Sequence, residues 1–295
     1  MEKTDIRPPF AASGGVVPPE FRKIKTPCYV LDEIALIKNA ELMGKIAEKT
    51  GCKMLLAQKA FSNYDCYHLL EPYLAGTEAS GLYEARLGAQ EMPGKEVHVF
   101  CAGYREDEFE ELLCFADHIV FNSPSQLLRF GKRAKQAGKS VGLRINPECS
   151  TQEGHEIYDP CAPGSRMGTT RAQWEAAVKM HPDLTGLLDG IHFHTLCEQD
   201  SSDLETTLAA VKVKFGDLIS QVKWLNLGGG HHITRPGYDI ARLEKCIEAA
   251  KEEWKVDIYL EPGEAWALNA GFFLTTVLDV LQNGDTRLAI LDGSA

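Results

Sequence analysis

The chain has 295 residues, 44% of them hydrophobic and 25% charged, which is enough for one large domain or for one domain and part of a second. Its 31 lysines and arginines against 42 aspartates and glutamates give a formal net charge of −11, which disfavours a nucleic-acid partner and weakly favours a cationic small substrate. The nine cysteines are never spaced as CxxC, which favours the reduced thiols of a cytoplasmic protein over disulfides or a structural zinc.

The N-terminal region is expected to contain a loose arm and then a strand and a helix. This region lacks the apolar core that is typical of a signal peptide. No stretch of the chain approaches the ~20 apolar residues of a membrane span. The helix should begin after Asp32, which suits an N-cap, and end before Gly51. Its predicted apolar stripe consists of Ile34, Ile37, Ala40, Met43 and Ala47.

Strand-like and helix-like segments then alternate over roughly 210 residues, which suits a (β/α)8 barrel of TIM type, typically about 250 residues long. An open doubly wound sheet is the alternative that this alternation leaves open. The predicted strands are 53–58, 76–80, 97–103, 118–122, 140–146, 187–194, 222–228 and 256–262.

After the last of these segments the alternation stops. Residues 271–292 read as two β-runs joined at Asn283-Gly284-Asp285, a sequence typical of a hairpin turn. We therefore predict three regions: an N-terminal arm and strand over 1–31 that joins a β-domain, an α/β barrel over 32–268, and the start of that β-rich domain over 269–295.

Lys59 is the first candidate for chemistry. It closely follows the apolar run Met54-Leu55-Leu56-Ala57, which is typical of a strand buried on both faces. An ammonium group there must reach water, pair with a carboxylate, or lose its charge through a lowered pKa or a covalent bond. From this stretch alone, reaching water is the favoured interpretation.

Other polar residues occupy the ends of the predicted strands, where barrel enzymes carry their active groups. They are Arg144 and Asn146, His192 and His194, the run Gly228-Gly229-Gly230, and Glu261. Backbone N–H groups of a glycine run can approach a phosphate closely, a lysine can form a Schiff base, and a carboxylate can hold a ring nitrogen protonated. This combination indicates pyridoxal 5'-phosphate (PLP).

Simpler interpretations remain open for each residue. The glycine run fits a flexible turn, Glu261 fits a salt bridge with Arg144, and His194 fits a hydrogen-bonded core histidine. Together, the four histidines also permit a metal site: His192, His194, His231 and His232.

The segments "AQKAFS", "FHTLCE", "NLGGGH" and "EPGEA" together resemble the PLP-dependent decarboxylases of the alanine racemase-like fold, which include ornithine and diaminopimelate decarboxylases. Within that group the chain is most similar to the bacterial decarboxylases of carboxynorspermidine and carboxyspermidine, from about Thr26 to the last residue. Glu264 supports this choice, because ornithine and diaminopimelate decarboxylases tend to have an arginine at its position.

The resemblance implies a role for each candidate residue. Lys59 would be the Schiff-base lysine, His194 would stack on the cofactor ring, and Glu261 would contact the pyridine nitrogen. Gly228, Gly229 and Gly230 would surround the phosphate, and Arg144 would lie near the cofactor. For a carboxypolyamine substrate, Glu264 and Asp292 would bind its amines.

The resemblance also implies a homodimer with shared active sites, in which a C-terminal β-domain gives a cysteine-bearing motif to the partner. The sequence stops at Ala295, before that motif, and has Gly293 where a hydroxyl residue is expected. We therefore expect a fragment or a shortened protein that, by itself, is poorly soluble and has little activity. The alternatives in function are decarboxylation of diaminopimelate or ornithine, a PLP-binding barrel without catalysis, and a metal-dependent hydrolase.

Overall fold

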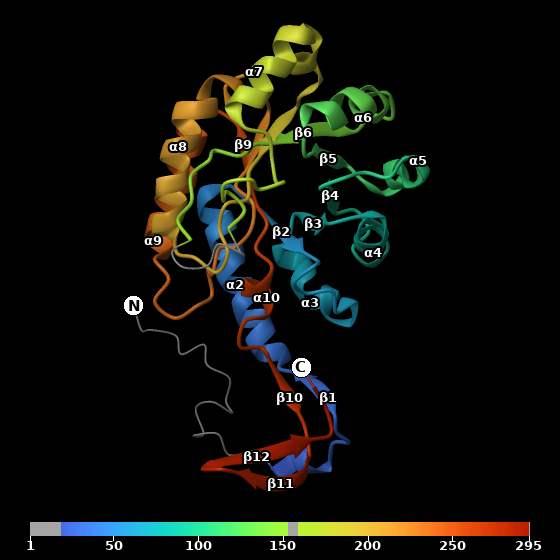
Figure 1. Cartoon of the computed structure of the whole chain (residues 1–295), viewed down its shortest axis with the longest axis vertical. Helices are drawn as coiled ribbons and strands as arrows, with labels where there is room; N and C mark the ends of the chain where they lie inside the picture. Colours follow the sequence, from blue (N-terminus) through green and yellow to red (C-terminus); the bar gives the residue numbers. More distant parts are fainter. Residues whose placement is uncertain (1–18, 153–158, 295) are drawn as a thin grey trace.

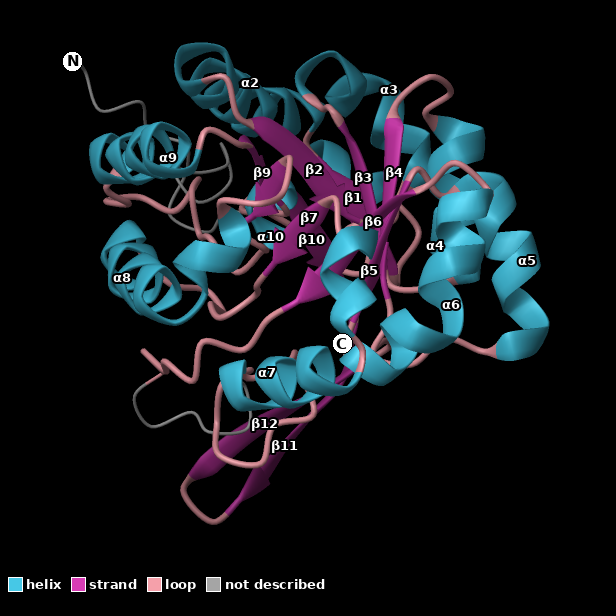
Figure 2. Ribbon diagram, turned by 90° about the horizontal axis from the view of Figure 1, so that it is seen from above, coloured by secondary structure: helices cyan, strands magenta, loops and turns pink. Residues whose placement is uncertain are grey.

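The computed structural model describes residues 19–152 and 159–294, so most of the N-terminal arm lies outside the described residues. Its centre is a closed barrel in which strands β2 to β9 follow one another in chain order, each parallel to its neighbours. Helices surround this barrel (Figure 1; Figure 2). The expectation of a (β/α)8 barrel is confirmed, and the open doubly wound sheet is excluded.

Most of the barrel strands arise from short apolar runs, as the sequence predicts. Their bounds are β2 (Lys53–Ala57), β3 (Gly76–Ala79), β4 (Glu96–Phe100), β5 (His118–Phe121), β6 (Ser140–Arg144), β7 (Gly190–His192), β8 (Trp224–Asn226) and β9 (Asp257–Leu260). In β2, Leu55 packs with Phe100 and Trp224, whereas Met54 and Leu56 pack in the larger cluster. Both faces of the strand are therefore buried, because side chains alternate along it.

The helices connect the strands and cover the outside of the barrel. They are α2 (Glu33–Thr50), α3 (Tyr67–Leu70), α4 (Leu82–Glu91), α5 (Glu106–Phe115), α6 (Pro124–Gln136), α7 (Arg171–Met180), α8 (Ser201–Ile219), α9 (Ile240–Trp254) and α10 (Glu264–Ala267). Short 3₁₀ turns add η1 (Pro19–Lys23), η2 (Tyr64–Cys66), η3 (Glu71–Tyr73) and η5 (Pro182–Leu187). None of the described helices combines the length and apolar character that crossing a membrane requires.

Helix α2 has the predicted ends. The Asp32 side chain accepts a hydrogen bond from the Ala35 N–H at 3.0 Å, which satisfies one of the free donors of the first turn. Gly51 ends the helix with a φ of 66°, a left-handed conformation in which glycine has no steric penalty.

The predicted apolar stripe of α2 was wrong at Ile34, whose exposed fraction is 68%. The buried face instead includes Leu36 and Asn39. The Asn39 amide donates hydrogen bonds to the carbonyl oxygens of Trp266 and Leu268 at 3.1 and 2.9 Å. A polar side chain is stable on the buried face because a segment more than 200 residues away supplies its acceptors.

Two small antiparallel sheets lie beside the barrel. Strand β1 (Cys28–Leu31) pairs with β10 (Gly271–Leu274), and β11 (Val277–Asn283) pairs with β12 (Thr286–Leu291). The hairpin expected in this region is present, with Asn283 opposite Thr286 across the turn, and it extends away from the barrel (Figure 1). The proposed division into regions at 31 and 268 stays a prediction.

Candidate active site

Four side chains and the glycine run that the sequence assigns to the active site lie at the carboxyl-terminal end of the barrel. Lys59 lies two residues beyond β2, Arg144 ends β6, His194 lies two residues beyond β7, and Glu261 directly follows β9. The glycine run 228–230 follows β8. Lys59, Arg144 and His194 line one cavity of about 230 Å³, together with residues of the segment 159–167. This end of a parallel barrel is where active sites form.

Glu261 is the acid of this group, and it is buried, with an exposed fraction of 4%. Its Oε2 atom lies 3.1 Å from Nε2 of His192, and its Oε1 accepts a hydrogen bond from the Asn226 amide at 2.7 Å. Burial opposes ionisation, but His192 and the nearby Lys59 outweigh it and lower the pKa of the carboxyl group. Glu261 is therefore a buried carboxylate.

Arg144 does not form the salt bridge with Glu261 that was the simpler interpretation of that carboxylate. Its guanidinium lies 4.5 Å from the centre of the Phe100 ring and donates a hydrogen bond to the carbonyl oxygen of His194 at 3.1 Å. Burial lowers its pKa to about 10, with Glu261 opposing the shift. Arg144 therefore keeps its positive charge at neutral pH, beside the cavity.

The imidazole of His194 packs against the glycine run. Its Nδ1 atom accepts a hydrogen bond from the Gly229 N–H at 3.3 Å. Burial, followed by the charges of Lys59 and Arg144, holds the pKa of His194 well below its usual value. His194 is therefore neutral, with a fixed acceptor nitrogen.

Glycine is required at position 229 because the turn passes between two neighbouring segments. A Cβ atom there would lie 2.5 Å from the Glu261 carbonyl oxygen and 3.1 Å from Cε1 of His194. The N–H of Gly228 donates to Oδ1 of Asn226 at 2.8 Å. The amides of Gly228 and Gly229 already have partners within the chain, and contact of the three glycines with a phosphate stays a prediction.

Glu78 is a site residue that the sequence reasoning missed. It lies in β3 with an exposed fraction of 2%, and its Oε2 atom has no hydrogen-bond partner among the described residues. Burial and, after it, the charge of Glu261 raise the pKa of Glu78 to about 8. The signal was available: a charged residue within the fully buried strand Gly76–Ala79 needs a reason to be there.

The two predicted substrate residues lie in different places. Glu264 begins α10, and its Oε1 atom is 3.5 Å from Nε2 of His232. Asp292 lies at the base of the hairpin, where it accepts hydrogen bonds from the Thr26 hydroxyl at 2.5 Å and the Thr276 N–H at 2.8 Å. These contacts do not bring Asp292 to the barrel residues, and its role in substrate binding stays a prediction.

The histidines do not form the four-histidine metal site that the sequence permitted. His192 pairs with Glu261, and Nε2 of His231 lies 3.4 Å from the carbonyl oxygen of Leu227. In the described part of the chain, the side-chain groups close enough to share an ion combine histidine with glutamate: Glu198, His232 and Glu264, and Glu96, His98 and His118.

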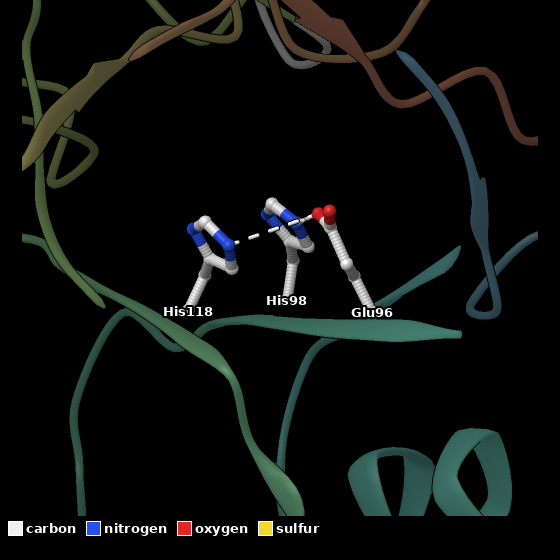
Figure 3. A group of neighbouring side chains, drawn as sticks. All are labelled: Glu96, His98 and His118. Carbon is white, nitrogen blue, oxygen red and sulfur yellow. Dashed lines mark hydrogen bonds and ion pairs between the residues drawn. The ribbon is translucent and has the colours of Figure 1, made fainter. Parts of the chain in front are cut away.

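The second of these groups, drawn in Figure 3, lies at the opposite, amino-terminal end of the barrel, since Glu96 begins β4 and His118 begins β5. The rings of His98 and His118 stack 4.0 Å apart at 7°, so their lone pairs run side by side rather than towards one point. Lys53 already occupies the other oxygen of Glu96 at 2.8 Å. This geometry is unsuited to a shared metal and suits a polar network that closes the barrel at the end that serves stability.

The relatives found by comparison with known proteins are all decarboxylases. The chain is 40% identical to the carboxynorspermidine/carboxyspermidine decarboxylase of Campylobacter jejuni, over 93% of this chain and 69% of that protein. It is 38% identical to the carboxyaminopropylagmatine decarboxylase of Synechocystis, over 94% of this chain and 70% of that protein. No family model matches the sequence.

A solved structure supports the same relationship. The crystal structure of carboxynorspermidine decarboxylase from C. jejuni, complexed with norspermidine, matches with a TM-score of 0.81 and 38% identity, over 92% of this chain and 68% of that one. The fold and these relatives define an enzyme of the barrel-type decarboxylases. Within that class, the chain belongs to the carboxynorspermidine/carboxyspermidine decarboxylase family.

Proposed function

We propose that this enzyme removes the α-carboxylate of carboxynorspermidine or carboxyspermidine, giving norspermidine or spermidine, and that it uses PLP held by Lys59. The observation that carries the proposal is the convergence of Lys59, the buried carboxylate of Glu261 and the glycine run at one end of the barrel. The names of the relatives support the substrate class.

The residues present fit PLP. Lys59 lines the cavity and has no hydrogen-bond or ion-pair partner among the described residues, so its amine is free to bond covalently. Glu261 supplies the buried negative charge that a protonated pyridine nitrogen needs. Arg144 adds a positive charge beside the cavity, and the neutral ring of His194 offers a flat packing surface.

When bound, PLP supplies a protonated ring that withdraws electrons from the substrate carbon as carbon dioxide leaves. Glu261 would hold the proton on that ring, since its carboxylate stays ionised beside His192. Asn226 fixes the second oxygen of Glu261, so the carboxylate cannot rotate away. His192 and Asn226 are thus positioning residues for Glu261.

Glu78 would contribute a protonated carboxyl group. At neutral pH burial keeps this group neutral, and it feels the charge of Lys59 as well as that of Glu261. It can therefore donate a hydrogen bond within the site without adding a second negative charge next to Glu261.

We also propose that the working enzyme is a homodimer whose sites are shared between subunits, as the family resemblance implies. Light scattering would measure the mass of the purified protein in solution. Mixing two inactive variants whose defects lie in different parts of the site would restore activity if the subunits share sites.

The experiment that tests the function measures carbon dioxide release from several candidate substrates under the same conditions. Carboxynorspermidine and carboxyspermidine should be the best substrates, with carboxyaminopropylagmatine as the competitor suggested by the second relative. Faster release from diaminopimelate or ornithine would overturn the substrate proposal. Bound PLP without carbon dioxide release from any of these compounds would indicate a non-catalytic barrel.

A further inference from the structure

Three side chains outside the proposed cofactor contacts converge on the same rim of the barrel. Glu198 follows β7, His232 follows β8, and Glu264 follows β9. These strands are neighbours in the closed barrel, and β9 pairs next with β2, which leads to Lys59. The loop before Glu264 packs tightly on the residue after Lys59, since a Cβ at Gly263 would lie 2.6 Å from that of Ala60.

The convergence is close. One nitrogen of His232 and one oxygen of each of the two glutamates lie within 4.8 Å of one another. His232 has an exposed fraction of 8%, yet both of its ring nitrogens lack a hydrogen-bond partner among the described residues. Its Nε2 atom is 3.5 Å from Oε1 of Glu264, too far for a good hydrogen bond. A buried ring left unpaired in this way needs a partner that the described residues do not supply.

Backbone hydrogen bonds fix the two loops that carry Glu198 and His232. The Gln199 N–H donates to the carbonyl oxygen of Gly230 at 3.0 Å, and the His232 N–H donates to the carbonyl oxygen of Gln199 at 3.2 Å. Glu198 adopts a left-handed φ of 54°, which is costly for a residue with a side chain. The positions of the side chains therefore follow from the loop structure.

The charge of these three side chains indicates which kind of ligand they can bind. Within the described residues, neither Glu198 nor Glu264 has a lysine or arginine within ion-pair distance. Two carboxylates facing one gap repel an anion and attract a cation. A protonated amine carries three donors, which matches two carboxylate oxygens and one acceptor nitrogen of the ring.

We propose that Glu198, His232 and Glu264 form a subsite for a protonated amine of the substrate, remote from the carbon that loses its carboxylate. This inference rests on the proposed function, because it assumes a substrate with more than one amine. The backbone at Gly263, next to Glu264, packs against Ala60, the neighbour of Lys59, so the subsite lies near the proposed reaction centre. A longer substrate can therefore extend from Lys59 towards the three side chains.

The test compares the variants Glu198→Gln, Glu264→Gln and His232→Phe with the matched control Glu253→Gln. Glu253 lies on α9 and pairs with Lys212 at the surface. Each of the three subsite variants should raise KM for the best carboxypolyamine about tenfold or more, with kcat and the absorbance of bound cofactor little changed. The control should behave as the unmodified enzyme.

Calorimetric binding of norspermidine gives a second measurement that needs no turnover. The same variants should weaken norspermidine binding by a similar factor, and circular dichroism should show that they remain folded. Unchanged KM and unchanged norspermidine affinity in both glutamate variants would overturn the subsite. Loss of bound cofactor from Glu264→Gln at normal substrate affinity would overturn it as well, by making Glu264 a cofactor contact.

A metal ion is the competing occupant. Stoichiometric zinc or manganese in the purified protein, with activity lost on chelation and restored by that metal, would show that the site binds a metal ion and not an amine. Failure of the proposed function is a separate result: the unmodified enzyme would then release no carbon dioxide from any carboxylated polyamine. Norspermidine binding would still decide whether the three side chains recognise an amine.

Discussion

The Nε2 atom of His192 lies 3.1 Å from Oε2 of Glu261, and the side chains are 1% and 4% exposed. Burial lowers the pKa of His192, so the ring is neutral and serves Glu261 through an N–H donor. The carboxylate thus receives one hydrogen bond on each oxygen, from His192 and from Asn226. A buried carboxylate with both oxygens occupied stays ionised and fixed in orientation.

Replacing Glu261 by glutamine tests that role. The neutral amide cannot hold a ring nitrogen protonated, so we expect cofactor to remain bound while kcat falls on the order of a hundredfold. Stopped-flow or steady-state carbon dioxide release measures the loss, and the cofactor absorbance measures binding. Glu175→Gln, on the surface of α7, is the control. Turnover close to that of the unmodified enzyme would remove Glu261 from its role.

Lys59→Ala should abolish the visible absorbance of lysine-bound cofactor, because no other lysine among the described residues lines the cavity. Turnover should fall to about 1% or less. Absorbance spectra after incubation with PLP, with Lys179→Ala on α7 as the matched control, check this expectation. A variant that kept the spectrum would show that another residue binds the cofactor.

Glu78 should make the cofactor-free protein less stable as pH rises. The folded protein keeps the Glu78 proton up to about pH 8, whereas the unfolded chain releases it near the ordinary value of 4.5. Between these values the folded state binds more protons, so the free energy of unfolding falls as pH increases and levels off above about 8. Urea denaturation across this range should show a flatter dependence for Glu78→Gln. Parallel curves for the two proteins would contradict the raised pKa.

The buried His118 leads to the opposite prediction for acidic solution: here the free energy of unfolding should fall as pH decreases. Burial and the neighbouring His98 lower its pKa to about 3, against 6.5 for an ordinary histidine. As pH falls below 6.5 the unfolded chain gains a proton that the folded protein refuses, so the free energy of unfolding falls. His118→Phe should remove this contribution in urea melts between pH 6.5 and 5. The exposed His68, changed in the same way, is the control; equal slopes for both variants would refute the prediction.

The sequence by itself determined the barrel and the positions of most of the chemistry. Short apolar runs separated by helical periods encode local backbone structure, and alternation of the two leaves few other folds. Polar residues at the ends of such runs must lie at the same rim of the barrel, because all the parallel strands end there. For that reason the sequence alone assigns Lys59, Arg144, His194 and Glu261 to the same end of the barrel.

Only the tertiary structure decided which of these side chains meet. Glu261 bonds His192, which is 69 residues away, rather than Arg144, and Asn39 is buried because a distant segment accepts its hydrogen bonds. The group of Glu198, His232 and Glu264 forms because three loops are neighbours in the closed barrel. The local sequence pattern reflects which residues are buried and which backbone conformation they adopt. The partners of each side chain depend instead on how the barrel closes and on the stagger between its strands.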